Sequence, residues 1–241
     1  MYRAAMAVGK FHGRNFTDGS SGEQARKEYS TMPQPDADPP VRAVLFDLGG
    51  VLLDWDPRHL YRRVFPDEAA MERFLATVCT QAWNEEQDAG RPFGEGVALL
   101  LARHPQHADE IRAYDLRWGE MLRGAIEESV TILGELRARG VPLFALTNWS
   151  AEKFPLARTR FGFLEWFDGI LVSGEERLKK PDPRIYRLAI ERFGLEPAET
   201  LYIDDAEANI AAAARLGFKT HHFVEAAALR GLFVACGLLS A

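Results

Sequence analysis

The chain contains little cysteine, no apolar run of membrane-spanning length and no excess of basic residues. Only Cys79 and Cys236 occur among its 241 residues, and their wide spacing argues against a disulfide framework or a thiolate metal site. No apolar run approaches the roughly 18 residues that a transmembrane helix requires, and no signal-like apolar block stands near the N-terminus. These absences predict a protein of the reducing cytoplasm with no membrane span.

The charge balance is acidic. The 29 Lys and Arg residues against 35 Asp and Glu residues give a net charge of −6. A protein that binds nucleic acid or an anionic membrane needs a basic surface, and this balance provides none. Hydrophobic residues make up 47% of the sequence, enough for a substantial core in a chain of this length. The composition favours chemistry on a small molecule.

The first forty residues have many helix breakers and no sustained apolar periodicity. We expect residues 1–40 to form a flexible tail. Met32 is an alternative start of the native protein, and the sequence does not decide whether residues 1–31 belong to it.

From residue 41 onward, short β-type runs alternate with helical patterns, which predicts a parallel sheet in an α/β fold. In the last part of the chain Asp182 and Pro183 start a helix that Gly194 ends. A βαβ unit needs only about 30 residues, yet the first strand end and the next lie 100 residues apart (147 − 47). We therefore expect a helical insertion at 57–123 and a core formed by 41–56 and 124–241. The predicted strands are 41–46, 141–146, 169–172, 201–203 and 219–223.

Polar residues stand at the ends of several predicted strands or on loops near them. In an open parallel sheet, ligands gather at the carboxyl ends of the strands, so such residues converge. Adjacent carboxylates repel each other unless a cation or a proton intervenes, and hard oxygen ligands suit Mg²⁺. The residues concerned are Asp47, Thr147, Asn148, Lys180, Asp204 and Asp205.

Four motifs in order resemble the haloacid dehalogenase-like hydrolase superfamily, in the branch with a helical cap between the first two motifs. They are Phe-Asp-Leu-Gly-Gly-Val-Leu, Leu-Thr-Asn, Lys-Pro-Asp-Pro-Arg-Ile-Tyr and Ile-Asp-Asp. Each motif alone is weak, but their order and their places on the expected elements are specific. The likeness spans roughly residues 41–223. It implies a Rossmann-like parallel sheet with a helical cap domain inserted after the first strand.

The resemblance also implies catalytic roles for four residues. Asp47 would be a nucleophile that forms an acyl phosphate. Thr147 and the backbone amide of Asn148 would bind the transferring phosphoryl oxygens. Lys180 would stabilise both the nucleophile and the phosphate. The expected reaction is hydrolysis of a small phosphomonoester, a sugar phosphate being one option, by a monomer or a homodimer.

The same resemblance implies a Mg²⁺ site. Its expected ligands are the carboxylate of Asp47, the backbone carbonyl of Gly49 and the carboxylate of Asp205, with Asp204 acting through water. Glycines in this turn allow the backbone to approach a ligand closely.

One position departs from the phosphatase pattern, since Gly49 stands where family phosphatases usually carry a second Asp as general acid and base. Without a replacement, the rate would fall by roughly 10²–10⁴-fold. Asp54, Asp56 and His59 follow nearby; Asp54 is our preferred substitute, and a hinge role for it is equally open. The stretch 83–90 is predicted either to face the substrate as a lid or to be an exposed helix end.

Two other functions stay open at this point. A 2-haloacid dehalogenase also uses an attacking Asp and a Lys, needs no metal, and places a tyrosine where Tyr186 stands; the pair Asp204 and Asp205 argues against it. A non-catalytic binding protein of the same fold would explain Gly49, but not the other retained site residues.

Overall fold

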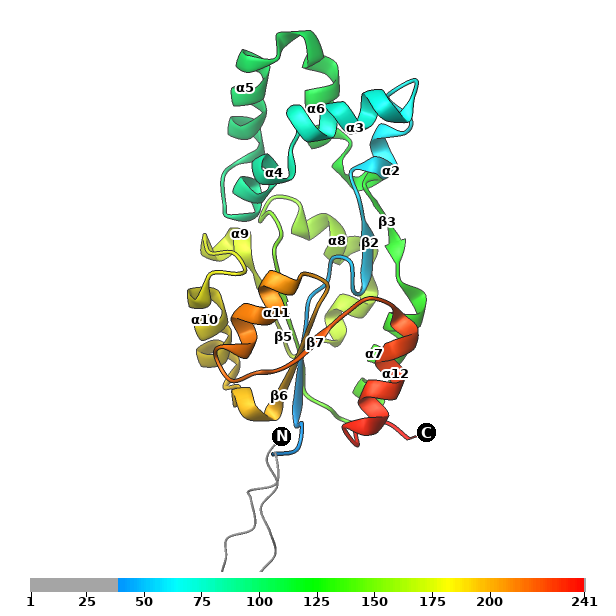
Figure 1. The fold of residues 1–241 in the computed structure, drawn as a ribbon, viewed down its shortest axis with the longest axis vertical. Coiled ribbons are helices and arrows are strands. Elements are labelled where there is room, and N and C mark those ends of the chain that lie inside the picture. Colours follow the sequence, from blue (N-terminus) through cyan, green and yellow to red (C-terminus); the bar gives the residue numbers. More distant parts are fainter. Residues whose placement is uncertain (1–38, 241) are drawn as a thin grey trace, which may run out of the picture. The chain divides into compact units, whose positions relative to one another are not determined.

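The computed structural model describes residues 39–240. Its centre is a five-stranded parallel sheet in the order β5-β4-β1-β6-β7 (Figure 1). The predicted α/β class with a parallel sheet is confirmed, and each of the five predicted strands is present within two residues of its expected ends. The predicted tail, except for residues 39 and 40, lies outside the described residues. The strands are β1 Ala43–Phe46, β4 Leu143–Thr147, β5 Gly169–Val172, β6 Thr200–Asp204 and β7 Lys219–His222.

Helices cover both faces of the sheet. Because successive side chains of a strand point to opposite faces, Val44 and Phe46 of β1 belong to one core cluster and Leu45 to the other. The first cluster includes side chains of α7 Glu127–Ala138, α8 Phe154–Arg160 and α12 Ala226–Ala235, and the second those of α10 Pro183–Phe193 and α11 Glu207–Ala214. The short helices of this part are α9 Ser173–Glu176, η4 Gly162–Trp166 and η5 Pro197–Glu199.

The helix after Lys180 begins and ends as the sequence predicts. The Asp182 carboxylate accepts a hydrogen bond from the amide of Arg184, Pro183 is the first helical residue, and Gly194 closes the helix with φ 62°. A left-handed conformation at this position favours glycine. This capping fixes α10 and, with it, the loop before it that carries Lys180.

Between β1 and β4 the chain leaves the sheet through a ribbon of two antiparallel strands, β2 Leu53–Trp55 and β3 Leu122–Ala125. The sequence did not predict this ribbon, because strands of three and four residues are too short to display an alternating pattern. Figure 1 shows α3, α5 and α6 beyond the ribbon, away from the body of the sheet. The helices between the two strands are α2 Arg58–Tyr61, α3 Glu68–Thr77, α4 Gln81–Asp88, α5 Phe93–Arg103, η2 Pro105–His107, α6 Ala108–Leu116 and η3 Trp118–Glu120.

Helix α4 is fastened to the carboxyl-end loops of the sheet. The Ser173 hydroxyl, after β5, donates to the backbone carbonyl of Asp88 at 2.5 Å. The ammonium of Lys179 binds the carboxylate of Glu85 at 2.5 Å. Helix α4 therefore lies against the edge of the sheet where the strands end.

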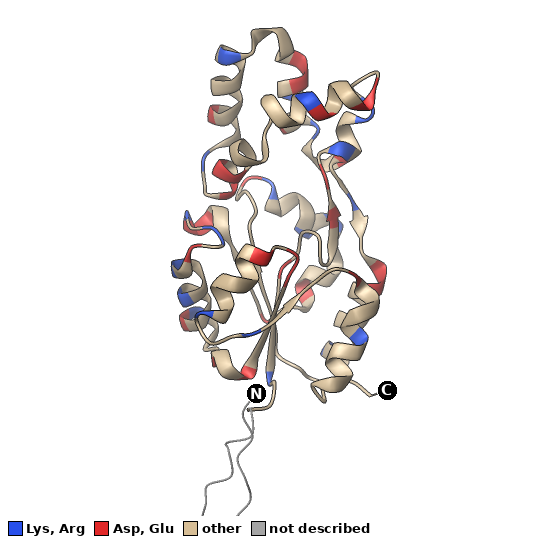
Figure 2. Ribbon diagram, in the orientation of Figure 1, with Lys and Arg blue, Asp and Glu red and all other residues tan. Residues whose placement is uncertain are grey.

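Charged residues of both signs are interspersed along the helices (Figure 2). Among residues 39–240, no helix is both long enough and apolar enough to cross a membrane. Cys79 and Cys236 are free thiols.

Candidate active site

The site is built around a buried ion pair. Strand β1 ends at Phe46 and delivers Asp47, whose residue surface is 8% exposed, next to Lys180, which is 2% exposed. The Lys180 ammonium lies 2.9 Å from Oδ1 of Asp47 and 2.7 Å from Oδ2 of Asp204. The backbone amide of Leu48 also donates to Oδ1 of Asp47, at 2.7 Å. The first, third and fourth motifs thus meet at one point.

Asp204 is fully buried, and its carboxylate accepts hydrogen bonds from several donors. Besides Lys180, it accepts hydrogen bonds from the Tyr202 hydroxyl, from the backbone amide of Ala206 at 2.8 Å, and from Nδ2 of Asn209 at 2.9 and 3.1 Å. A buried charge is tolerated only when it is paired and hydrogen-bonded in this way. Asp204 therefore orients the lysine, and few of its lone pairs are left for another ligand.

Asp205 is exposed and lies over the glycine turn after β1. A Cβ atom on Gly50 would come within 2.2 Å of Oδ2 of Asp205, and the φ of Gly50 is 73°. Both facts require glycine at this position, because any side chain would displace the carboxylate and strain the backbone. The glycine turn after β1 thus leaves room for the carboxylate that follows β6.

Three carboxylates converge here. One oxygen each of Asp47, Asp204 and Asp205 lies within 4.8 Å of the others. Burial raises the pKa of Asp47 to about 7, against the opposing effect of Lys180. Burial and then the charge of Asp204 raise the pKa of Asp205. An acidic cluster with one ammonium has the charge and the oxygen ligands that suit a hard divalent cation.

Lys180 and Asp204 each shift the pKa of the other, so that both stay charged. Burial lowers the pKa of Lys180, but the carboxylates of Asp47 and Asp204 outweigh that effect and raise it above its ordinary value. Burial alone would raise the pKa of Asp204, yet Lys180 brings it below its ordinary range. The lysine is therefore a fixed positive charge in this site rather than a proton donor.

The second motif is hydrogen-bonded to the loop that carries Lys180. The Asn148 side chain accepts from the backbone amide of Lys180 at 2.8 Å and donates to the backbone carbonyl of the same residue at 3.0 Å. Thr147 is buried at the end of β4, the strand next to β1. The reciprocal amide contacts fix the position of the lysine relative to the sheet.

Neither Asp54 nor Tyr186 has an evident place in this cluster. Asp54 pairs with His59 at 2.8 Å, and its side chain is 40% exposed. His59 lines a different, open hollow of about 640 Å³ among arginines. Tyr186 is buried, donates to the backbone carbonyl of Asn209 at 3.1 Å and packs edge-on against Tyr202. A packing role accounts for Tyr186.

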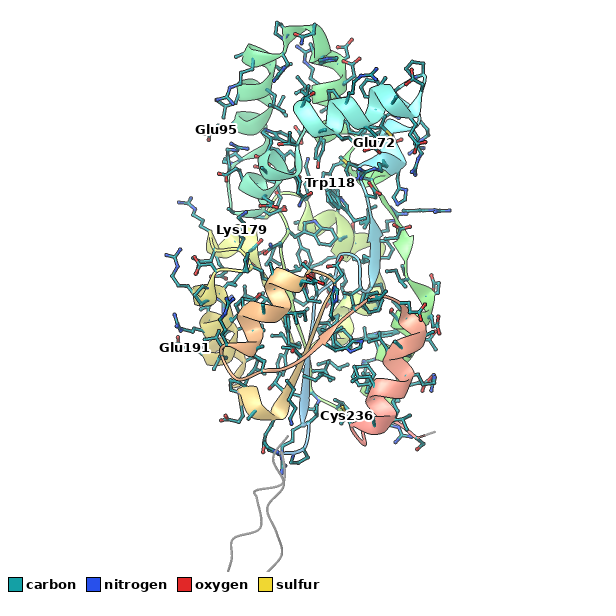
Figure 3. The ribbon with its side chains drawn as sticks, in the orientation of Figure 1. Glu72, Glu95, Trp118, Lys179, Glu191 and Cys236 are labelled. Atoms are coloured by element: carbon teal, nitrogen blue, oxygen red, sulfur yellow. The ribbon has the colours of Figure 1, made fainter. Side chains whose placement is uncertain are left out.

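A cavity of about 50 Å³ lies between the glycine turn and the inserted helices. Figure 3 labels Trp118 of η3 in this region, between the helices α3 to α6 and the sheet. The indole nitrogens of Trp55 and Trp149 are buried and have no hydrogen-bond partner within the described part of the chain. The sequence left residues 83–90 open between a lid and an exposed helix end and did not single out a cavity-lining residue there. The lining consists of Gly49, Trp55, Asn84, Asp88, Trp118, Asn148 and Trp149.

The chain is similar to proteins of more than one activity. A sesquiterpene phosphatase from Aspergillus oryzae is 26% identical over 198 residues, which cover 78% of this chain and 92% of that protein. A HAD family enzyme from Bacteroides thetaiotaomicron, solved with magnesium and inorganic phosphate, has a TM-score of 0.59 at 21% identity and covers 75% of this chain and 93% of its own.

An L-2-haloacid dehalogenase from Xanthobacter autotrophicus, solved with chloropropionic acid covalently bound, has a TM-score of 0.55 at 19% identity and covers 83% and 84% of the two chains. At these identities the two structures establish a shared fold alone. The model of the haloacid dehalogenase-like hydrolase family matches residues 41–217, well over half of the sequence. The chain belongs to the haloacid dehalogenase-like hydrolase family, as its motifs predicted, and is a hydrolase.

Proposed function

We propose that this hydrolase is a magnesium-dependent phosphatase of small phosphomonoesters, sugar phosphates among them, and that Asp47 carries the phosphoryl group during turnover. One observation supports this most strongly: Lys180 is clamped between Asp47 and Asp204, and Asp205 adds a third carboxylate within 4.8 Å. The named activity of the Aspergillus relative agrees with it. We further propose that the protein acts in the cytoplasm as a monomer or a homodimer.

The donor set fits Mg²⁺. Carboxylates of Asp47 and Asp205 and the backbone carbonyl of Gly49 would hold the ion, all of them hard oxygen ligands. Asp204 would serve it indirectly, because its oxygens already accept hydrogen bonds from the lysine, Tyr202 and Asn209. When bound, the ion would offset the negative charge of the phosphoryl group.

The residues of the chain then divide the reaction into two steps. The described donors to the Asp47 carboxylate both engage Oδ1, so we assign Oδ2 to attack phosphorus. Lys180, the Thr147 hydroxyl and the Asn148 amide would stabilise the charge on the phosphoryl oxygens. Water then hydrolyses the aspartyl phosphate, releases inorganic phosphate and restores the carboxylate.

We propose the inserted helices, residues 57–123, as a cap over a core formed by 41–56 and 124–241. A cavity of about 50 Å³ lies beneath them. We propose that α4 moves away from the sheet when a phosphomonoester enters. The contacts of Asp88 and Glu85 with the carboxyl-end loops would break and re-form in each cycle.

The two rival functions have less support. For a dehalogenase, Tyr186 has a packing role, and three clustered carboxylates would repel a haloacid carboxylate. A non-catalytic binding protein would not require the Lys180 ammonium to lie 2.9 Å from a carboxylate oxygen of Asp47.

One paired assay separates the three functions. Phosphate release from a panel of sugar and polyol phosphates is measured with Mg²⁺ and with EDTA, beside chloride release from 2-chloropropionate. We expect phosphate release that EDTA abolishes and no chloride release. Metal-independent chloride release would establish the dehalogenase, and inactivity in both assays would leave the binding protein.

A further inference from the structure

The turn after Asp47 leaves an open space where the family phosphatases usually carry their proton donor. A Cβ atom on Gly49 would meet no other atom within 4 Å. Gly49 also lines the cavity beneath the inserted helices. A group that replaces the missing Asp should therefore reach this cavity from another element.

Among the described residues that line the cavity, Asp88 alone has a side chain that can give and take a proton near neutral pH. The others are glycine, asparagine and tryptophan. Asp54 and His59, the nearest candidates in sequence, bind each other and do not line it. Among the described residues of the lining, Asp88 of α4 is therefore the one candidate for the proton donor.

Contacts on three sides hold Asp88 against the strand-end loops. Its Oδ2 accepts from Nδ2 of Asn84 at 3.1 Å, and the backbone of Ser150 lowers the pKa of its carboxyl group. Its backbone carbonyl accepts from the hydroxyl of Ser173, which also accepts from the amide of Trp149 at 2.9 Å. The carboxyl group is therefore positioned on the loop that begins with Thr147 and Asn148.

The surroundings of Asp88 favour the protonated form. Burial, followed by the charge of Glu85 on the same helix, raises the pKa of Asp88 to about 7, while Lys179 on the sheet side opposes this. Tyr114 of α6 also faces the group and stays neutral, since burial and then Asp88 raise the pKa of its phenol. A carboxylic acid with a pKa near the working pH suits general acid and base catalysis.

We propose that Asp88 is the general acid and base of the reaction, in place of the Asp that Gly49 lacks; this rests on the proposed phosphatase function. As Oδ2 of Asp47 bonds to phosphorus, the bond from phosphorus to the ester oxygen breaks and that oxygen takes the proton of Asp88. The alcohol leaves. Water then attacks the phosphorus of the aspartyl phosphate, gives a proton to the Asp88 carboxylate, and the bond from phosphorus to Asp47 breaks.

The test compares two leaving groups in Asp88→Asn. An alkoxide needs a proton to leave, whereas 4-nitrophenolate does not. With Mg²⁺ present, we expect kcat/KM for the best alkyl phosphate of the panel to fall by about 10²–10⁴-fold, and kcat/KM for 4-nitrophenyl phosphate to fall by less than about tenfold. Retained hydrolysis of the aryl ester also shows that the variant is folded.

Glu86→Gln provides the matched control, because Glu86 is an exposed carboxylate on the same helix, and both activities should stay at the wild-type level. Equal losses on the two substrates in Asp88→Asn would indicate a structural role and overturn the proposal, as would no loss on the alkyl ester. A wild-type enzyme that cleaves neither ester would instead refute the phosphatase function itself.

Discussion

Two groups of residues at the candidate site differ in how completely their polar groups are satisfied. The first, which we call the sheet wall, is the cluster of Asp47, Lys180, Asp204 and Asp205 at the strand ends, in which the buried lysine binds two carboxylates and Asp204 accepts from several donors. The second, the opposite or tryptophan wall, lines the cavity and includes two indole N–H groups without a partner among the described residues; it consists of Trp55, Asn84, Asp88, Trp118 and Trp149.

This difference separates two tasks. A site that stabilises developing charge must have its dipoles and charges fixed before the reaction, and the sheet wall meets that condition. A buried donor without a partner costs about 1–3 kcal/mol, which an oxygen atom of a substrate can recover. We infer that the sheet wall serves the phosphoryl group common to all substrates and the tryptophan wall serves the variable alcohol.

The largest effect is expected on the sheet wall, from Gly50→Ala. The new Cβ would displace the Asp205 carboxylate, 2.2 Å away, and occupy a left-handed φ of 73°. We expect Mg²⁺ affinity to fall about 10–100-fold and the free energy of unfolding to fall by about 1–2 kcal/mol. Titration of phosphatase activity with Mg²⁺ and denaturant unfolding measure the two quantities.

Gly140→Ala is the matched control, because Gly140 also has a left-handed φ, 72°, but a Cβ there meets nothing within 4 Å. It should show a similar loss of stability with unchanged Mg²⁺ affinity. Equal Mg²⁺ affinities in the two variants would contradict the role of Asp205 as a ligand.

A smaller effect is expected on the tryptophan wall, from the pH dependence of stability. Asp88 has a pKa of about 7 in the folded state against 3.8 in the unfolded chain. Between these values the folded state binds a proton that the unfolded chain has lost, so this contribution to stability is fully present below the unfolded pKa and is lost as pH rises through the folded pKa. The amide introduced by Asp88→Asn cannot titrate. As the pH rises from 5 to 8, the free energy of unfolding of the variant should therefore increase by about 1–2 kcal/mol relative to that of wild type.

Urea unfolding at several pH values measures this gain, with Glu86→Gln as the reference. A constant difference between Asp88→Asn and wild type across the range would show that Asp88 is ionised throughout. The two walls would then not differ in the way described above.

The sequence predicted the sheet wall better than the opposite wall, and the reason is physical. Asp47, Thr147 and Asp204 stand at or directly after strand ends, where the topology of a parallel sheet brings residues together. Such positions can be inferred without any knowledge of packing. The structure accordingly brings all the predicted charged residues of that wall into one cluster.

The opposite wall depends on how the inserted helices dock, which local patterns do not encode. Helix α4 has three acidic residues, Glu85, Glu86 and Asp88, and nothing in their spacing shows that Asp88 meets the strand-end loops. For the same reason the sequence did not show that Asp54, the acid nearest to Gly49 on its C-terminal side, pairs with His59. The short ribbon of β2 and β3, which connects the inserted helices to the rest of the chain, gave no periodic signal.

The most direct test of the account is to identify the group that becomes bonded to Asp47 during turnover. The enzyme is mixed with Mg²⁺ and its best phosphomonoester, quenched in acid, digested and analysed by mass spectrometry, with Asp47→Asn as the control. We predict a phosphoryl group on the peptide that contains Asp47 and none in the variant. Hydrolysis of the ester without any phosphoryl group on Asp47, or with equal labelling in Asp47→Asn, would contradict the account.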